Sequence, residues 1–265
     1  KYVKAMLIDF DLMKQFQIKA SRLKSFYNRV KENYPSNPFH NFFHAFSVMH
    51  SCYLVLRNTK AEETFNNSEI LAMLVSSVCH DLGHTGHNNA FEVNSSSEYA
   101  ISYNDKSVLE NFHSASTFRI LRDHSCNIFE NLPHDLYRSV RKLMIECILG
   151  TDMIRHFTMI SNMTARFKDL EDHPLGTLED DIEKLAAFIV HTADLAHPSK
   201  DFTQYSRFSR LVCEEFTHQY NEEVQNGLPT HEFMKGLDEP KAYFKNELGF
   251  LTVIVKPLWE CLGLW

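Results

Sequence analysis

Residues 68–91, SEILAMLVSSVCHDLGHTGHNNAF, decide the fold class and carry the first chemical signal. The first half of this stretch places apolar residues on one face of a helix: Ile70, Leu71, Leu74, Val75 and Val78. We expect Ser68 to be the N-cap of this helix and Gly83 to stop it. The histidine cluster that begins at His80 and Asp81 therefore lies at a helix C-terminus.

The same periodicity recurs along the chain, so we predict an all-α fold. Thr177 and Asp180 have near capping-box spacing at the start of a second helix, which delivers Asp194 near its end. A third helix is expected to begin at Ser107, and a fourth to end at the Asn-Gly pair 226–227. No segment shows the alternation and hairpin turns of paired strands, and no internal repeat is visible.

Length and composition indicate a single globular body. The chain has 265 residues with only 8 Gly and 8 Pro, and no low-complexity or single-sign charged segment divides it. We therefore expect one catalytic domain over residues 1–265. The net charge of −7, without a run of Lys or Arg, argues against a nucleic-acid-binding surface. An anionic substrate would need local attraction, which a bound cation supplies.

The sequence favours a cytoplasmic location. The six cysteines show no CxxC spacing, and four of them lie in apolar helical patterns, which favours reduced thiols over disulfides. Asp9 and Asp11 interrupt the short apolar stretch at the start, so no signal peptide is expected. The longest uncharged apolar runs, near 70–79 and 250–255, are far shorter than the roughly 20 residues that span a bilayer.

Two histidines, His40 and His44 in FHNFFHAF, lie four residues apart. On a helix this spacing places both imidazoles on one face, so both can point into one site. A single histidine on such an aromatic-rich face is more often a hydrogen-bonded core residue. The spacing leaves both interpretations open.

His80 and Asp81 form a stronger signal, because adjacent imidazole and carboxylate groups are typical ligands of divalent ions. A buried carboxylate without a cation or several donors would be costly. Asp194, in ADLAHP, is by itself either an ordinary helix-end carboxylate or a further ligand. One histidine from the first motif, the His-Asp pair and Asp194 give the order H…HD…D. That order is typical of metal-dependent phosphohydrolases on helical scaffolds.

Glu110 has two interpretations. Ser107 and Glu110 fit a capping box, in which the Glu110 side chain bonds back to the backbone of Ser107. Alternatively, Glu110 is an outer carboxylate that accepts a hydrogen bond from metal-bound water.

Several motifs together closely resemble the catalytic domain of the class I cyclic nucleotide phosphodiesterases. They are FHNFFHAF, HDLGHTGHNNAF, YNDKSVLEN, GTDM, VHTADLAHPSK and ELGFL, in this order. Residues 80–91 fit that family's signature at every constrained position, and the resemblance covers roughly residues 34–260. It implies a compact multi-helix domain of the HD phosphohydrolase type. Such domains usually continue on both sides, so we expect a chain trimmed at both ends, with regulatory domains in a longer parent.

The resemblance implies hydrolysis of cAMP, cGMP or both to 5′-nucleoside monophosphates. His44, His80, Asp81 and Asp194 match the ligands of a first metal, zinc, and Asp81 also matches a ligand of a second, magnesium or manganese. In such enzymes a hydroxide that bridges both ions attacks the phosphate. His40 matches the general acid that protonates the leaving 3′ oxygen. Further residues match positions behind the metals and around the phosphate: His84, Asn89, Glu110, His113 and Thr151.

The expected base pocket departs from the family at one position. In this family the base lies between a phenylalanine and an aliphatic side chain, which Phe250 and Val212 match. Glu247 stands where the family normally has a glutamine, and a carboxylate only accepts hydrogen bonds, whereas an amide also donates. We expect Glu247 to disfavour cAMP unless protonated, and to permit cGMP in a shifted pose. His197 resembles the calmodulin-dependent, dual-specificity branch and favours relaxed base choice.

Two alternatives were weighed against a cyclic nucleotide phosphodiesterase. The first is another H…HD…D phosphohydrolase, and two features argue against it: His40 four residues before His44, and the ELGF segment. A weakly active or inactive protein that binds cyclic nucleotides is supported only by Glu247 and by Phe112, which replaces a histidine common in the family. The complete set of metal ligands argues against the second alternative.

Overall fold

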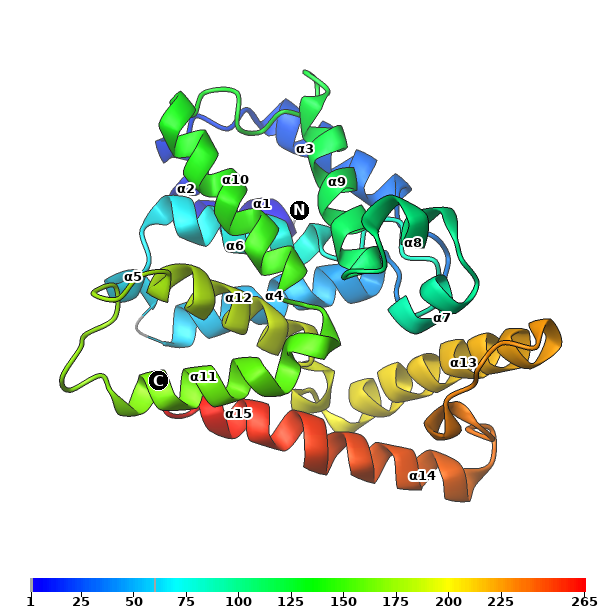
Figure 1. The fold of residues 1–265 in the computed structure, drawn as a ribbon. Coiled ribbons are helices and arrows are strands. Elements are labelled where there is room, and N and C mark those ends of the chain that lie inside the picture. The colour runs from blue at the N-terminus through cyan, green and yellow to red at the C-terminus, as the bar shows by residue number, and fades with distance from the viewer. Residues whose placement is uncertain (1, 60) are drawn as a thin grey trace.

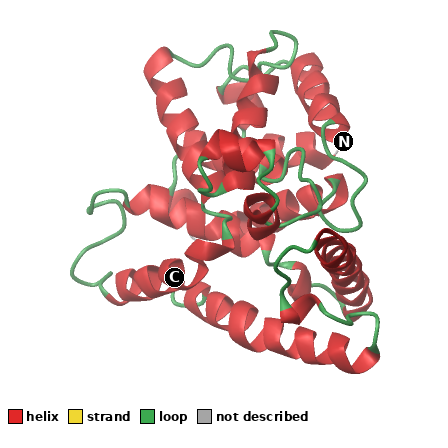
Figure 2. Cartoon of the chain, turned by 45° about the vertical axis from the view of Figure 1, so that its right-hand side comes forward, coloured by secondary structure: helices red, strands yellow, loops and turns green. Residues whose placement is uncertain are grey.

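The computed structural model describes residues 2–59 and 61–265, which form helices joined by loops (Figure 2). The described residues contain no β-strand, so the predicted all-α fold is confirmed. The helices, in chain order, are α1 (Tyr2–Asp9), α2 (Leu12–Gln15), α3 (Ala20–Glu32), α4 (Phe42–Asn58), α5 (Ala61–Thr64), α6 (Asn67–Cys79), α7 (Asn89–Asn94), α8 (Glu98–Tyr103), α9 (Val108–Arg122), α10 (His134–Leu149), η1 (Met153–Arg155), α11 (His156–Lys168), α12 (Asp181–Asp194), η2 (His197–Ser199), α13 (Phe202–Asn226), η3 (Glu232–Met234), α14 (Pro240–Gly249), η4 (Phe250–Val255) and α15 (Lys256–Leu262).

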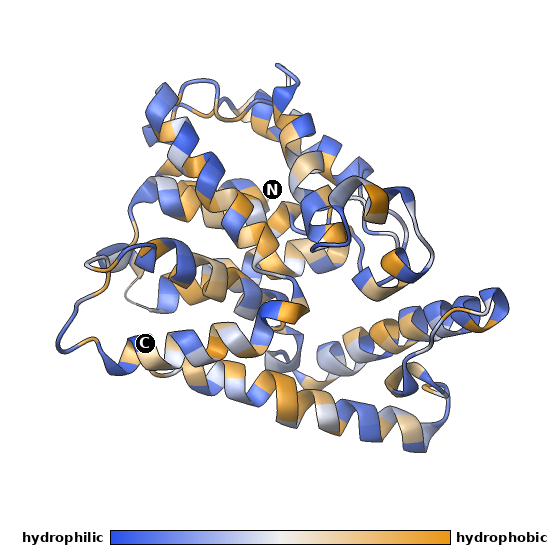
Figure 3. Cartoon of the chain, in the orientation of Figure 1, coloured by the Kyte–Doolittle hydropathy of each residue, from blue (hydrophilic) through white to orange (hydrophobic). Residues whose placement is uncertain are grey.

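Helix α6 forms the centre of the fold. It packs against α4, α10 and α12 (Figure 1), and all its residues from Ile70 to Cys79 are buried. A helix that is surrounded on all sides needs apolar or internally bonded side chains all round. Ser77 meets this condition by donating its hydroxyl to the Met73 carbonyl, 2.8 Å away. The sequence predicted one apolar face, whereas the helix is buried all round. Outer helices such as α10 and α13 instead mix apolar and polar residues (Figure 3).

The start of α6 corrects the predicted N-cap. Asn66, not Ser68, caps the helix: its side-chain oxygen accepts from the backbone N–H groups of Ser68 at 2.9 Å and Glu69 at 3.2 Å. Glu69 closes the capping box by accepting from the Asn66 N–H at 2.8 Å. Ser68 lies in the first turn. Since Asn66 has a glutamate three residues later and Ser68 does not, the reciprocal box selects the earlier residue.

The start of α12 shows that the predicted Thr177 and Asp180 capping box was wrong. The Thr177 hydroxyl donates to the Pro174 carbonyl at 2.7 Å, and Asp180 has φ of 59° and makes no side-chain cap. The neighbouring Asp181 instead forms an ion pair, in which its two oxygens accept from Arg166 Nε and Nη2 at 2.7 Å each. This bidentate pair ties α11 to the start of α12.

The predicted stop of α6 at Gly83 was wrong, because α6 ends at Cys79 and the N–H groups of Leu82 and His84 make turn bonds to the carbonyls of Cys79 and Asp81. The predicted start of α9 and end of α13 agree with the structure. Helix α9 starts directly after Ser107, and α13 ends before Gly227, whose φ of 65° favours glycine. Helices α14, η4 and α15 follow one another without a break, and η4 is a π-helical turn at Phe250–Val255. All six cysteines are buried and unpaired, as predicted. None of the helices in the described part of the chain has the length and apolarity needed to cross a membrane.

Gly83, which lies in the turn after α6 and within the histidine cluster, has φ of 76°. A Cβ at this position would lie 2.8 Å from Phe112 Cε1. We expect Gly83→Ala to lower the free energy of unfolding by about 1–3 kcal/mol, because it adds a clash to the left-handed backbone penalty. Urea unfolding measures this loss. Gly227→Ala is the matched control, since Gly227 also has positive φ but no atom within 4 Å of the added Cβ. Equal losses in both variants would contradict the role of Phe112.

Candidate metal centre and catalytic site

Four side chains from three packed helices converge at the ends of those helices. His44 lies in the first turn of α4, His80 and Asp81 follow the last turn of α6, and Asp194 is the last residue of α12. One ligand atom from each lies within 4.8 Å of the others. The sequence predicted this set, and the fold brings it together.

The spacing of the donor atoms suits a divalent ion. His44 Nε2 lies 2.9 Å from Asp194 Oδ1, 3.3 Å from Asp81 Oδ2 and 3.3 Å from His80 Nε2. His80 Nε2 lies 3.0 Å from Asp81 Oδ2 and 3.1 Å from Asp194 Oδ1. Neighbouring ligands of a metal with bonds of about 2.0–2.2 Å are about 2.8–3.6 Å apart. Asp81 Oδ2 is buried and accepts no hydrogen bond from the described residues, so it offers a free ligand atom.

The surrounding backbone orients these groups. His80 Nδ1 donates to the Ser77 carbonyl at 2.8 Å, which leaves Nε2 with its lone pair toward the cluster. Burial alone would raise the pKa of Asp194, but the charge of His80 holds that pKa well below its usual range. Burial alone would lower the pKa of His80, but the charges of Asp81 and Asp194 raise it. A divalent cation would therefore take the place of the proton held by the His80 imidazole.

His40 lies beside this cluster and is held by Glu215 of α13. The His40 Nδ1–H donates to Glu215 Oε1, while Glu215 Oε2 accepts from the backbone N–H groups of Phe39 at 2.9 Å and His40 at 3.0 Å. Glu215 is 3% exposed. Burial lowers the pKa of His40, but the Glu215 charge and hydrogen bond outweigh it and raise that pKa to about 9. His40 is therefore protonated at neutral pH, with Nε2–H bonded to none of the described residues.

Two further histidines lie behind His40 in a stack. The rings of His40 and His84 are nearly parallel, at 3.9 Å between centroids, and His113 follows at 5.6 Å from His84. His84 Nδ1 accepts from the Gly86 N–H at 3.0 Å, and burial and the charge of His40 lower the pKa of His84 well below its usual range. His113 Nδ1 donates to the Leu82 carbonyl at 2.8 Å, and its Nε2 lies 3.7 Å from Asp81 Oδ1. Both predicted residues thus lie next to the cluster.

The structure excludes one of the two interpretations of Glu110. Its carboxylate accepts from Asn89 Nδ2 at 2.9 and 3.2 Å, and the Ser107 hydroxyl donates instead to Asp152 at 2.7 Å. The capping box is therefore wrong. Burial first, and then the nearby Asp152, raise the pKa of Glu110 to about 7. The Thr151 hydroxyl donates to the Ile148 carbonyl at 2.8 Å, so it is turned toward the backbone of α10.

The residues predicted for a base pocket lie on α13, on η2 and at the junction of α14 with η4, and contacts join His197 to Phe250 and Glu247 to Tyr205 of α13. The ring of Phe250 stacks on His197 at 5.4 Å with 12° between planes, and burial lowers the pKa of His197 to about 3. The Tyr205 hydroxyl donates to Glu247 Oε2. Val212 is half-buried on α13, seven residues after Tyr205 and hence on the same helix face.

Comparison with known proteins gives the family. The family model for 3′5′-cyclic nucleotide phosphodiesterases matches residues 39–264. The chain belongs to this family. The mouse (Mus musculus) dual specificity calcium/calmodulin-dependent 3′,5′-cyclic nucleotide phosphodiesterase 1B is 34% identical over 97% of this chain and 47% of its own length. The human high affinity cGMP-specific 3′,5′-cyclic phosphodiesterase 9A is 32% identical over 96% of this chain and 42% of its length.

Solved phosphodiesterase domains share the fold. The phosphodiesterase domain of the RhoPDE fusion protein from the choanoflagellate Salpingoeca rosetta matches with a TM-score of 0.94 and 37% identity. The match covers 99% of this chain and 82% of that one. The chain spans about half the length of the curated phosphodiesterases that it matches.

Two residues of this phosphodiesterase site escaped the prediction from sequence. Glu215 and Tyr205 lie on α13, 175 residues from His40 and 42 residues from Glu247, respectively. A signal for Glu215 does exist: Glu215, Gln219 and Glu223 recur every four residues on one face of α13, and all three are buried. A buried polar stripe of this kind needs partners elsewhere in the fold.

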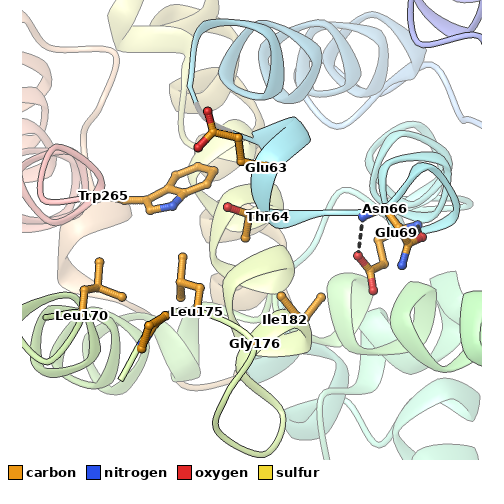
Figure 4. A pocket seen from close by; sticks show the side chains of 10 residues that line it. Glu63, Thr64, Asn66, Glu69, Leu170, Leu175, Gly176, Ile182 and Trp265 are labelled. Carbon is orange, nitrogen blue, oxygen red and sulfur yellow. Dashed lines mark hydrogen bonds between the residues drawn. The ribbon is translucent and has the colours of Figure 1, made fainter. Parts of the chain in front are cut away.

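A well-formed pocket of this domain lies away from the cluster. A pocket of about 570 Å³ opens between α5, the start of α6 and the segment before α12 (Figure 4). Its lining includes Glu63, Glu69 and Trp265 and shares no residue with the histidine–aspartate cluster. Its lining contains no histidine, so this pocket lacks the metal-binding groups of the cluster.

Proposed function

We propose that this chain hydrolyses 3′,5′-cyclic nucleotides to 5′-nucleoside monophosphates. The observation that carries the proposal is the convergence of His44, His80, Asp81 and Asp194 beside a His40 that Glu215 keeps protonated. The relatives named as cyclic nucleotide phosphodiesterases support it. Six buried, unpaired thiols support a reducing compartment such as the cytoplasm.

The metal site is proposed to take zinc, with magnesium or manganese at a neighbouring site that shares Asp81. Two imidazoles and two carboxylates are ligands that zinc accepts, and the second ion prefers oxygen. When bound, such ions stabilise the charge of the phosphate and lower the pKa of water that attacks it. His84, His113, Asn89 and Glu110 would keep the ligand-bearing loop in place, and Thr151 would border the phosphate.

His40 is proposed to donate the proton that the leaving 3′ oxygen requires. Its Nδ1 is held by Glu215, so the Nε2–H is the available donor. The buried Glu215 carboxylate keeps the imidazole both oriented and protonated, which are the two conditions of general acid catalysis.

Glu247 is proposed to read the base edge together with Tyr205. Because Tyr205 donates to Oε2, the other oxygen, Oε1, is left for the base and can only accept. Guanine offers an N1–H donor at its edge, whereas adenine offers a lone pair at N1. We therefore propose that the chain prefers cGMP, with the base between Phe250 and Val212 and His197 bordering it.

Glu247→Gln is expected to shift this preference toward cAMP. If Tyr205 keeps donating to the side-chain oxygen, the amide N–H₂ faces adenine N1 and removes a clash between two acceptors. We expect kcat/KM for cAMP to rise roughly tenfold, because such a mismatch at a desolvated edge costs about 1–2 kcal/mol. Steady-state kinetics on both nucleotides measure the ratio, and Glu239→Gln, exposed before α14, is the matched control. An unchanged ratio would refute the assignment.

Glu215→Gln is expected to change the pH profile. His40 must be protonated, so kcat/KM falls as pH rises through the pKa of His40, which lies at about 9. Without the Glu215 charge, the lowering effect of burial gains weight and the alkaline limb should move down by about 1–3 pH units. The neighbouring, exposed Glu214 provides the control Glu214→Gln. The same alkaline limb in wild type and Glu215→Gln would contradict the role of Glu215.

Hydrolysis of both cyclic nucleotides by the metal-loaded chain tests the proposal as a whole. The expected result is turnover of both, with higher kcat/KM for cGMP and loss of activity after chelation. Bound metal without turnover would instead favour a nucleotide-binding protein without activity.

A further inference from the structure

Two histidines outside the metal cluster, His156 and His191, form a buried pair between α11 and α12. Each is 0% exposed, and His156 Nδ1 lies 2.9 Å from His191 Nε2. His156 is the first residue of α11, and His191 lies in the last turn of α12, three residues before Asp194. The pair thus joins the start of one helix to the end of the helix that carries a proposed metal ligand.

The other nitrogens of the pair are unsatisfied. A neutral imidazole has one N–H and one acceptor nitrogen, and the shared bond uses one of each. His156 Nε2 and His191 Nδ1 are buried and make no hydrogen bond with the described residues. If His156 donates, the buried Nδ1–H of His191 has no acceptor; if His191 donates, the Nε2–H of His156 has only the Ile254 carbonyl nearby, without normal hydrogen-bond geometry. Such a group costs free energy, and two apolar side chains of similar size would avoid that cost.

Both rings of the pair are neutral near pH 7. Burial lowers the pKa of His191 to about 4, although Asp194 opposes this, and burial also lowers the pKa of His156. The Ile254 carbonyl in η4 favours the protonated form of His156, without a hydrogen bond of normal geometry. The shared bond is therefore a directional contact between neutral groups, which fixes how the two helices face each other.

The last turn of α12 depends on this bond. Among the described residues, no other side-chain hydrogen bond joins that turn to α11, and the Thr192 hydroxyl bonds within its own helix to the Phe188 carbonyl. On the other side of the turn, Asp194 contacts His44 and His80. Residues three apart on a helix are neighbours, so a rotation that moves His191 moves Asp194 with it.

We propose that His156 and His191 are positioning residues, which set the rotation of the last turn of α12 and so place the Asp194 carboxylate against His44 and His80. The inference rests on the metal centre of the proposed function but not on hydrolysis, since metal affinity alone reports it.

Paired substitutions separate positioning from stability. His156→Leu with His191→Leu removes the bond together with the unsatisfied nitrogens. His156→Asn with His191→Gln keeps amide groups near the positions of Nδ1 and Nε2. Phe167→Leu is the matched control, because Phe167 packs on Phe188 across the same two helices, with 6.0 Å between rings, and does not touch the pair.

Zinc affinity of the metal-free chain, measured by competition with a chromophoric chelator, is the main readout. We expect a loss of about 10–100-fold in the leucine pair, as for other groups that orient metal ligands, and recovery of most of it in the Asn/Gln pair. The thermal unfolding midpoint of the leucine pair should equal or exceed that of the wild type. Phe167→Leu should lower that midpoint and leave zinc affinity unchanged.

Wild-type zinc affinity in the leucine pair would overturn the inference, and so would zinc affinity that follows the unfolding midpoint across all variants. If the leucine pair does not fold, His191→Leu and His191→Gln provide the same comparison. Loss with leucine and retention with glutamine supports positioning, and equal affinity overturns it. Normal zinc binding without turnover in the wild type would count against the proposed hydrolysis alone.

Discussion

Replacement of Asp194 by asparagine is expected to release the metal and to abolish measurable hydrolysis. The asparagine keeps the size of the side chain but loses the charge that lies 2.9 Å from His44 and 3.1 Å from His80. Groups that only support metal ligands are worth about 10–100-fold in affinity, so loss of a charged ligand should cost roughly 10²–10³-fold. We expect kcat/KM to fall by at least about 10³-fold at limiting metal, because the proposed metals would supply both the activated water and charge stabilisation.

Metal content after gel filtration and initial rates measure this effect. Asp172→Asn is the control, because Asp172 is an exposed carboxylate in the loop before α12. It should keep full metal content and activity. An Asp194→Asn variant that retains a full complement of metal would remove Asp194 from the ligand set.

His40→Asn is expected to lower kcat by about 10²–10⁴-fold while leaving metal content unchanged, since a positioned general acid contributes in this range. His40 bonds to Glu215 and not to the four proposed ligands, so its loss should affect the proton transfer and not the metal. KM should change little for the same reason. Steady-state kinetics and metal analysis on the same preparation test both parts.

A change of leaving group makes this prediction specific. A phosphodiester with a p-nitrophenolate leaving group needs no proton, so His40→Asn should lose far less activity on it than on cGMP. His218→Asn, an exposed histidine on α13, controls for the substitution itself and should behave as the wild type. Equal losses on both substrates would show that His40 does not act as the acid.

The helices could be predicted from the sequence because their periodic apolar faces are local features. Helix starts were harder, since several residues compete for each cap. Asn66 and Ser68 are both good N-caps, and only the bond from Glu69 decides between them. Thr177 was misassigned because Asp181, which binds Arg166, determines the conformation of the segment before α12. In both cases the outcome depends on a second residue that the cap pattern alone does not weigh.

The site divides in the same way. The proposed metal ligands lie in short motifs, so their residue types and spacing indicated them. Glu215 and Tyr205 contact His40 and Glu247 only after α13 packs across the chain. The polar stripe on α13 indicates that Glu215 needs a partner but does not identify His40 as that partner. The pair of His156 and His191 was missed for the same reason, since 35 residues separate its members.

The most direct test of metal-dependent cyclic nucleotide hydrolysis is reaction of cGMP in H₂¹⁸O with the zinc- and magnesium-loaded chain, followed by mass analysis of the product. The account predicts 5′-GMP that carries one ¹⁸O atom on phosphorus, formed by the wild type and not by Asp194→Asn. No 5′-GMP from the fully metal-loaded wild type, or label in the ribose, would contradict it.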